Sequence, residues 1–294
     1  MGCAIIGCGK SLPALAVAND DLTQLVDTSD EWITTRTGIK SRRIAVGETN
    51  VDLAEAAARQ AMGLVEGGYC EAPIEPESID LVVYSTCTPD VLVPSCAALV
   101  RRRLGLVNAV AFDVNAACSG FIYAMSVAES MMAASAAGVA GAGRRNKVRR
   151  ALVIGSERLT RITNWEDRTT CVLFGDGGGA AVVEWDEGRA GVLATYMKND
   201  DDDTNALTCP SAFDSPQPFD VNGVSKEAAV AGDPGNARID EELGVTEAVA
   251  AGRPRQSLFM HGQTIFKFAA NAMGNAIDEV CKRADVDIDD VKLI

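Results

Sequence analysis

The sequence is poor in several features that define common classes of protein. Its 294 residues contain a single histidine, His261, which excludes a histidine-rich metal site. The 27 basic residues are outnumbered by 41 acidic ones, and a net charge of −14 argues against a protein that binds nucleic acid or membrane surfaces through a broad basic face. Residues 119–143 carry one charge, Glu129, but the run is rich in Ala, Gly and Ser, so we expect a buried helix there and no membrane span.

The nine cysteines contain no CxxC pair, and their number is odd. This pattern predicts a reducing compartment and argues against a disulfide framework. The chain enters strand-like sequence at Cys3–Cys8, so we expect no signal peptide.

Alternating apolar strands and helices in the first part of the chain predict an α/β protein with a parallel sheet covered on both faces. We expect Asn50 to cap one helix and Pro94 to occupy the first position of another. Strands are expected at residues 3–8, 81–85, 109–114 and 151–154, and helices at 21–26, 51–64, 94–104 and 119–137.

From residue 179 the pattern changes. Residues 180–184 and 191–196 flank a turn and predict a β-hairpin. Residues 199–256 are rich in Asp, Pro, Gly and Ala, which predicts a long acidic surface insertion that is partly disordered. A helix is expected over 263–283. We therefore expect two parts, a complete half at 1–178 and a partial half at 179–294.

The stretch around Cys118 carries the strongest chemical signal. A β-run at 109–114 is followed by small residues, then Cys118, then the long helical run. A thiol at the start of a helix lies near unpaired N–H groups and the positive end of the helix dipole, and both stabilise the nucleophilic thiolate. The local pattern predicts an acyl-accepting nucleophile, with a buried, packed cysteine as the alternative.

Four motifs then resemble one family. They are residues 26–39 (VDTSDEWITTRTGI), 111–121 (AFDVNAACSGF), 174–180 (FGDGGGA) and 260–267 (MHGQTIFK). The chain resembles β-ketoacyl-acyl-carrier-protein synthase III, the condensing enzyme of the thiolase superfamily that initiates type II fatty acid synthesis. The resemblance implies a five-layered α/β/α/β/α fold, with the second half incomplete here, and usually a homodimer.

The resemblance also implies a mechanism and a set of site residues. Cys118 would take an acyl group, typically acetyl, from coenzyme A and condense it with malonyl-acyl-carrier protein; coenzyme A is a substrate, and no cofactor or metal is expected. Lys267 would lie where carrier protein docks. The residues that would bind the coenzyme A substrate or line its tunnel are Thr28, Trp32, Arg36, Thr37, Arg168, Leu173, Phe174, Gln263 and Phe266.

The family completes its catalytic triad with a His and an Asn in its second half, just after the strand that we expect to begin at Val291. Neither lies within these 294 residues, because His261 falls at the head of a helix, where the family places no catalytic residue. We therefore expect a C-terminally truncated fragment in which acylation survives in part and condensation is impaired.

Several alternatives stay open. The chain resembles condensing enzymes broadly enough that it could take longer or branched primers, or act on 3-hydroxy-3-methylglutaryl or polyketide substrates; Val93 lies near the position that closes the family's acyl tunnel. It could also be a non-catalytic acyl-thioester binder, or a redox sensor if Cys118 had a resolving cysteine nearby, and the sequence shows none. The compartment is expected to be the plastid stroma for a eukaryotic source, with its transit peptide absent, and otherwise the cytoplasm.

Overall fold

The computed structural model describes residues 2–139, 147–202, 204–210, 219–220, 223–224, 241, 246 and 257–293. Its centre is a six-stranded sheet with the strand order β4-β1-β8-β7-β5-β6. The strands are β1 (Gly2–Ser11), β4 (Tyr69–Cys70), β5 (Leu81–Ser85), β6 (Val110–Val114), β7 (Arg150–Arg158) and β8 (Asp176–Asp186). The strands predicted at 3–8, 81–85, 109–114 and 151–154 are confirmed.

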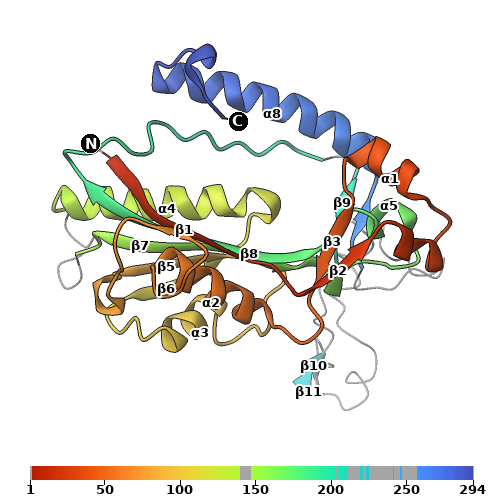
Figure 1. The fold of residues 1–294 in the computed structure, drawn as a ribbon, viewed down its shortest axis with the longest axis horizontal. Helices are drawn as coiled ribbons and strands as arrows, with labels where there is room; N and C mark the ends of the chain where they lie inside the picture. The colour runs from red at the N-terminus through yellow and green to blue at the C-terminus, as the bar shows by residue number, and fades with distance from the viewer. Residues whose placement is uncertain are drawn as a thin grey trace.

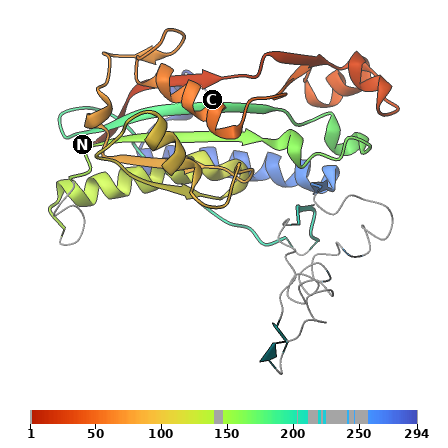
Figure 2. The same cartoon turned by 90° about the horizontal axis from the view of Figure 1, so that it is seen from below.

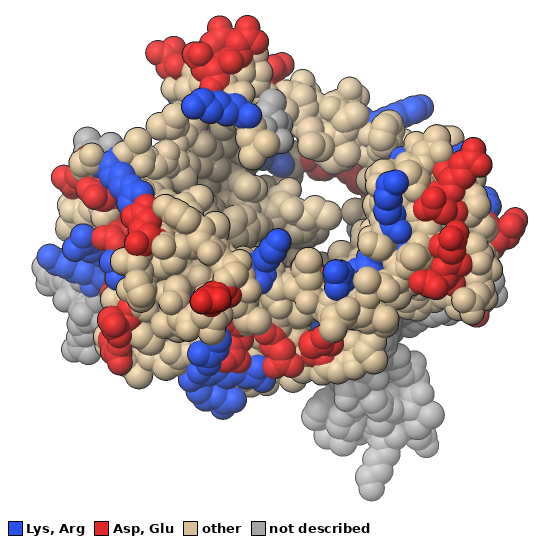
Figure 3. Space-filling model, in the orientation of Figure 1, with Lys and Arg blue, Asp and Glu red and all other residues tan. Residues whose placement is uncertain are grey.

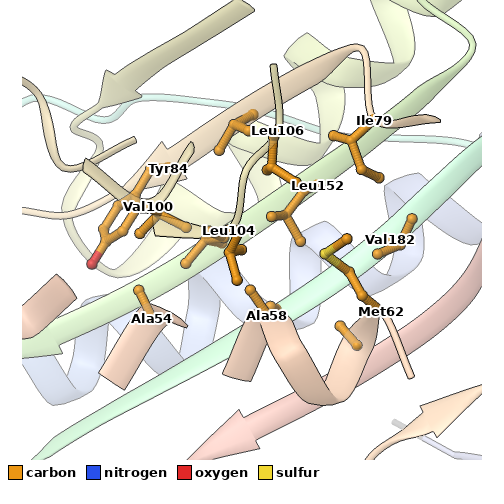
Figure 4. Packing of buried hydrophobic residues seen from close by; sticks show 14 of the residues in the cluster. Ala54, Ala58, Met62, Ile79, Tyr84, Val100, Leu104, Leu106, Leu152 and Val182 are labelled. Atoms are coloured by element: carbon orange, nitrogen blue, oxygen red, sulfur yellow. The ribbon is translucent and has the colours of Figure 1, made fainter. Parts of the chain in front are cut away.

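Helices cover both faces of this sheet (Figures 1 and 2). On one face lie α2 (Asn50–Ala61) and α3 (Cys96–Arg103), whose alanines and valines pack against β5, β7 and β8. Figure 4 shows this cluster, in which Tyr84 and Leu152 from the sheet meet Ala58 and Met62. On the other face lies α4 (Gly120–Ala136), whose small residues fit closely against the strands.

Only part of the sheet is parallel, which corrects the prediction of a parallel sheet. β5 pairs in parallel with β6 and β7, whereas β8 runs antiparallel to both β7 and β1. The predicted hairpin at 180–184 and 191–196 is wrong. Residues 180–184 belong to β8, in the middle of the sheet, and residues 191–196 form no strand. β8 finds its partners far away in the chain, which the local pattern does not reveal.

Two helix starts also differ from the prediction. Thr49, and not Asn50, caps α2, through a reciprocal capping box with Asp52. Asn50 is buried instead, and its amide donates to Thr86 Oγ1 and the Thr88 carbonyl, both at 2.9 Å. Helix α3 starts after Ser95, so Pro94 precedes it. The expected helix at 21–26 is a short 3₁₀ segment, Asp20–Gln24.

A small lobe carries the first motif. It contains the hairpin of β2 (Leu15–Ala18) and β3 (Ser41–Ile44), and the helices α1 (Asp30–Thr37) and α5 (Arg168–Cys171). Ser29 caps α1 by accepting from the Trp32 N–H, and Gly38 ends it with a φ of 71°. The lobe has its own apolar cluster, built around Leu22, Ile33, Cys171 and Val172.

Helix α8 (Gly262–Ala284) confirms the helix expected at 263–283 and forms a further layer beyond α4. None of its residues is buried, and Figure 3 shows an opening below it. Its start is held by the short pair β9 (Leu207–Thr208) and β12 (Phe259–Met260). No strand begins at Val291 in the described residues.

The sheet continues through the expected boundary at residue 178, because β8 spans it. The division into halves at 1–178 and 179–294 therefore stays a prediction. The expected acidic insertion at 199–256 lies largely outside the described residues. Its described residues include three short strands: β9, which pairs with β12, and β10 (Phe219–Asp220) and β11 (Gly223–Val224), which pair with each other.

Candidate functional site

Cys118 lies where strand β6 passes into helix α4. The single 3₁₀ turn Ala117–Ser119 joins the two elements, and the side chain of Cys118 is exposed. Ala117 has a φ of 44°, a conformation that costs a non-glycine residue about 1–2 kcal/mol. Such strain is concentrated at functional sites, where the surrounding structure enforces it. The predicted strand–turn–helix with a thiol at the turn is confirmed, and the buried alternative is wrong.

The start of α4 is fixed by a close approach to strand β5. Gly120 is buried, and a Cβ added to it would lie 1.9 Å from Ser85 Oγ and 3.1 Å from Ser85 Cβ. A larger residue at this position would require the Ser85 side chain to rotate and the helix or strand to shift slightly. This contact locates the turn, and hence Cys118, at the carboxyl end of the parallel strands β5 and β6.

A second thiol lies at this end of the sheet. Strand β5 continues into Thr86, whose N–H donates to the Val114 carbonyl at 3.1 Å, and then into Cys87. Burial, followed by the charge of Glu157, raises the pKa of Cys87 to about 12. The register of β5 against β6 places Cys87 and Cys118 at the same end of the sheet. This corrects the expectation that Cys118 has no cysteine nearby.

Trp32 sits between two guanidinium groups in the small lobe. Arg36 Cζ lies 4.5 Å and Arg168 Cζ 4.6 Å from the centroid of the indole ring, so both are within cation–π range. Arg168 also donates to the Asp27 carbonyl at 2.8 Å. The structure thus brings together three predicted residues that are up to 136 positions apart.

The two threonines predicted to bind the coenzyme A substrate differ in their hydrogen bonds. Thr28 Oγ1 is buried and has no hydrogen-bond partner, which is costly for a hydroxyl and leaves it free to bind a polar group of a ligand. Thr37 Oγ1 is already engaged, since it donates to the Ile33 carbonyl at 2.8 Å and accepts from the Ile39 N–H at 3.0 Å. Thr37 therefore stabilises the end of α1.

The remaining predicted residues fall into two groups. Leu173 packs in the apolar cluster beside Trp32, and Phe174 is half-buried just before β8. Gln263, Phe266 and Lys267 lie on the first turns of α8, where Phe266 is 73% exposed. The described chain therefore offers no enclosed tunnel at α8.

His261 precedes α8 at the N-cap position, and its Nδ1 lies 2.7 Å from Thr264 Oγ1. Its side chain is exposed, and the contact with Thr264 gives its Nδ1 atom a hydrogen-bond partner. Among the hydrogen bonds of the described residues, none joins the His261 side chain to the turn that carries Cys118.

A hollow of about 360 Å³ lies elsewhere, beside Ser135, Lys147 and Trp185, at the amino end of β7. Within the residues described above, no three His, Cys, Asp or Glu side chains are grouped to hold a metal ion. Among the helices that the structure describes, none is both long and apolar enough to cross a membrane.

An exposed cysteine on a strained turn at the carboxyl end of parallel strands, in a chain that also carries an aromatic–guanidinium cluster, is an arrangement that suits acyl transfer. Comparisons with known proteins agree. The family described as 3-oxoacyl-[acyl-carrier-protein (ACP)] synthase III matches residues 112–201.

Similar proteins extend the match over nearly the whole chain. The β-ketoacyl-[acyl-carrier-protein] synthase III of Rhodospirillum centenum is 48% identical over 201 residues, which cover 67% of this chain and 57% of that protein. The synthase III of Xylella fastidiosa is 40% identical over 284 residues, covering 96% and 72%. The crystal structure of the synthase III from Aquifex aeolicus is 36% identical with a TM-score of 0.70, covering 99% and 75%.

The chain belongs to the β-ketoacyl-acyl-carrier-protein synthase III family of acyltransferases. The predicted mixed α/β, thiolase-like fold is confirmed. The chain spans 57 to 75% of the length of the three proteins named above.

The contact between Gly120 and Ser85 yields a testable prediction. Gly120→Ala should destabilise the protein by about 1–3 kcal/mol, because overpacking forces α4 away from β5, and should slow alkylation of Cys118 by iodoacetamide. Adding Ser85→Gly removes both clashing atoms and should restore most of each loss. Urea unfolding and peptide mapping measure the two effects. Equal losses in the single and double variants would show that the contact does not position the turn.

Proposed function

We propose that Cys118 is the nucleophile that accepts the acyl group from an acyl-coenzyme A, typically acetyl-coenzyme A. The observation that carries this proposal is the exposed thiol of Cys118 on the strained turn between β6 and α4. The thiolate attacks the thioester carbonyl carbon, the bond from that carbon to the coenzyme A sulfur breaks, and coenzyme A leaves as its thiolate. The N–H groups of the turn would donate to the oxyanion.

The acyl-enzyme would then condense with malonyl-acyl-carrier protein, releasing carbon dioxide and a 3-oxoacyl product, which is the first condensation of type II fatty acid synthesis. That step builds negative charge on a thioester oxygen and needs donors aimed at it. Removing one such donor typically costs about a hundredfold or more in rate. The described site supplies the nucleophile for the first step. The neighbouring side chains of Thr86, Cys87 and Thr88 are neutral, so they carry no positive charge for the negative oxygen of the second step.

Incubation with labelled acetyl-coenzyme A tests the nucleophile. We expect one acetyl group per chain, found by peptide mapping on Cys118, and none in Cys118→Ser. Cys8→Ser is the matched control, because Cys8 is also an exposed thiol but lies on β1. Addition of malonyl-acyl-carrier protein then shows whether the acyl group is consumed. A wild-type chain in which Cys118 stays unlabelled contradicts the proposal.

We propose that the adenine of coenzyme A binds at Trp32. Arg168 Cζ now lies over the ring at 4.6 Å, so a purine that inserts between them must displace the guanidinium outward by about 3.5 Å, one stacking distance. The guanidinium groups of Arg36 and Arg168 suit the phosphates, and the unpartnered Thr28 Oγ1 can bond a phosphate or ribose oxygen. Thr37 would contribute indirectly, by stabilising the end of α1.

A truncated substrate tests this placement. Trp32→Ala should raise the KM for acetyl-coenzyme A by about ten- to a hundredfold, the loss expected for one base–aromatic stack of about 1–3 kcal/mol. The KM for S-acetyl-pantetheine, which lacks the nucleotide, should stay unchanged. Trp165→Ala is the control, because Trp165 is another tryptophan that packs in the same apolar cluster. An equal rise for both substrates would indicate general damage to the lobe.

We propose a homodimer that uses the loop before α3. Val91, Leu92 and Val93 are consecutive and 44%, 63% and 86% exposed, an unusual run of apolar side chains for a free surface. Leu92→Asp should weaken self-association at least tenfold in sedimentation equilibrium, because a charge would be buried. Val46→Asp, at another exposed valine, should leave it unchanged. A monomeric wild type would contradict the dimer.

Longer or branched primers are the second candidate. The exposed Val93 is smaller than an aromatic residue, and in a dimer it would line the acyl tunnel of the partner. Turnover of isobutyryl- or octanoyl-coenzyme A above that of acetyl-coenzyme A would favour this alternative. Gln263, Phe266, Leu173 and Phe174 would then line a wider tunnel, and exposed Lys267 would contact the acidic carrier protein.

The compartment and the division of the chain are also proposals. A plastid location would apply to a eukaryotic source, whereas the relatives compared above are bacterial. Import of the precursor into isolated plastids would test it. We propose the two thiolase-like halves at 1–178 and 179–294, and limited proteolysis would test whether they separate.

A further inference from the structure

Two thiols meet at one end of the sheet because two parallel strands end there in register. Ser85 pairs with Val114 at the ends of β5 and β6. Cys87 follows two residues after Ser85, and Cys118 four residues after Val114. The hydrogen bond from the Thr86 N–H to the Val114 carbonyl, 3.1 Å long, holds together the two segments that follow β5 and β6.

Glu157, near the end of β7, holds the segment Thr86–Thr88. Its Oε1 accepts from the Cys87 N–H at 2.7 Å. Its Oε2 accepts from Thr86 Oγ1 and from the Thr88 N–H, both at 3.0 Å, and from Thr88 Oγ1. Four donors thus converge on one carboxylate, and they define the path of the segment that carries Cys87.

The same carboxylate acts on the Cys87 thiol. After burial, the charge of Glu157 and a hydrogen bond to it are the largest causes that raise the pKa of Cys87. Glu157 Oε1 lies 2.7 Å from the Cys87 N–H, and a carboxylate this close disfavours the thiolate, so Cys87 is the poorer nucleophile. Cys118, by contrast, is exposed on its turn.

We propose that Glu157 is a positioning residue that fixes the Thr86–Thr88 segment beside Cys118 and keeps Cys87 from competing for the acyl group. This inference rests on the proposed role of Cys118. It explains why a second thiol is tolerated so close to the nucleophile.

The competing reaction is a thioester exchange. A Cys87 thiolate would attack the carbonyl carbon of acyl-Cys118, a new carbon–sulfur bond to Cys87 would form, and the bond to the Cys118 sulfur would break. The proton lost by Cys87 would end on the Cys118 thiolate or in solvent. Reactant and product are both alkyl thioesters of similar energy, so the block must be kinetic, and a protonated Cys87 supplies it.

Acyl mapping in three variants tests the proposal. Wild-type protein, Glu157→Gln and Glu157→Gln/Cys87→Ser are incubated with labelled acetyl-coenzyme A between pH 7 and 10, quenched in acid and digested. We expect wild type to carry nearly all of its label on Cys118. Glu157→Gln should carry at least fivefold more label on Cys87 than the small background in wild type, with the label rising with pH. The double variant should again carry label on Cys118 alone.

Glu184→Gln is the matched control. Glu184 lies on β8 of the same sheet, and its partners are Arg149 and Arg150. This variant should keep the wild-type pattern. Label on Cys87 in this variant as well would show that the effect is a general loosening of the sheet and would overturn the proposal.

A second readout uses iodoacetamide and needs no acyl group. Removing the negative charge of Glu157 should lower the pKa of Cys87, so its alkylation should begin at lower pH in Glu157→Gln than in wild type. If Glu157→Gln does not fold, the pH dependence of alkylation in wild type tests the proposal. Alkylation of Cys87 beginning at the same pH as that of Cys118 would overturn it.

The outcomes separate the two proposals. An unlabelled Cys118 in wild type is a failure of the proposed function. A labelled Cys118 in wild type, with Cys87 unlabelled in Glu157→Gln up to pH 10, leaves the function standing and overturns the role of Glu157.

Discussion

The buried contact between Gly120 and Ser85 is the constraint on which the site depends. It places the first turn of α4 directly on the end of β5, so closely that a Cβ at Gly120 would clash with the Ser85 side chain. The chain must then cover the distance from Val114 to Gly120 in one tight turn, and the left-handed Ala117 is the result. The strain at this turn is offset by the packing of α4 against the sheet, and the product is an exposed thiol at a fixed point.

Around that point, the fold separates two chemical environments. The end of the sheet is lined by hydroxyl, amide and thiol groups held by Asn50 and Glu157, while the small lobe carries Trp32 with Arg36 and Arg168. A thioester of coenzyme A has an uncharged reacting end and a charged nucleotide end. Under the proposed function, the reacting end would lie at the sheet and the nucleotide at the small lobe, and each environment is built by a different group of elements.

The sequence predicted those parts of the structure that depend on neighbouring residues. The strands at 81–85, 109–114 and 151–154 were visible as apolar runs, and the turn at Cys118 was visible as small residues between a strand and a helix. The cluster around Trp32 came from the family resemblance, because Trp32 and Arg168 are too far apart in the chain for any local pattern to join them.

The features that were missed depend on pairing between distant segments. Strand β8 looked like half of a hairpin, because its true neighbours β1 and β7 lie elsewhere in the chain. Cys87 looked isolated for the same reason, since only the register of β5 against β6 brings it near Cys118. Thr49 and Asn50 are both good capping residues, and the burial of Asn50 against Thr86 decided between them.

Helix α8 is long but has no buried side chain, and this sets its stability apart from that of the sheet. Its 23 residues belong to none of the three apolar clusters, and hydrogen bonds hold its two ends, from the His261 N–H to the Ala206 carbonyl and from Arg283 to the Thr195 carbonyl. Separating α8 from the sheet layers therefore exposes little apolar surface and costs little free energy. Its amide hydrogens should exchange with solvent through a local opening that leaves those of β5 and β7 protected. Helix α8 would then open at a lower free energy than the sheet does.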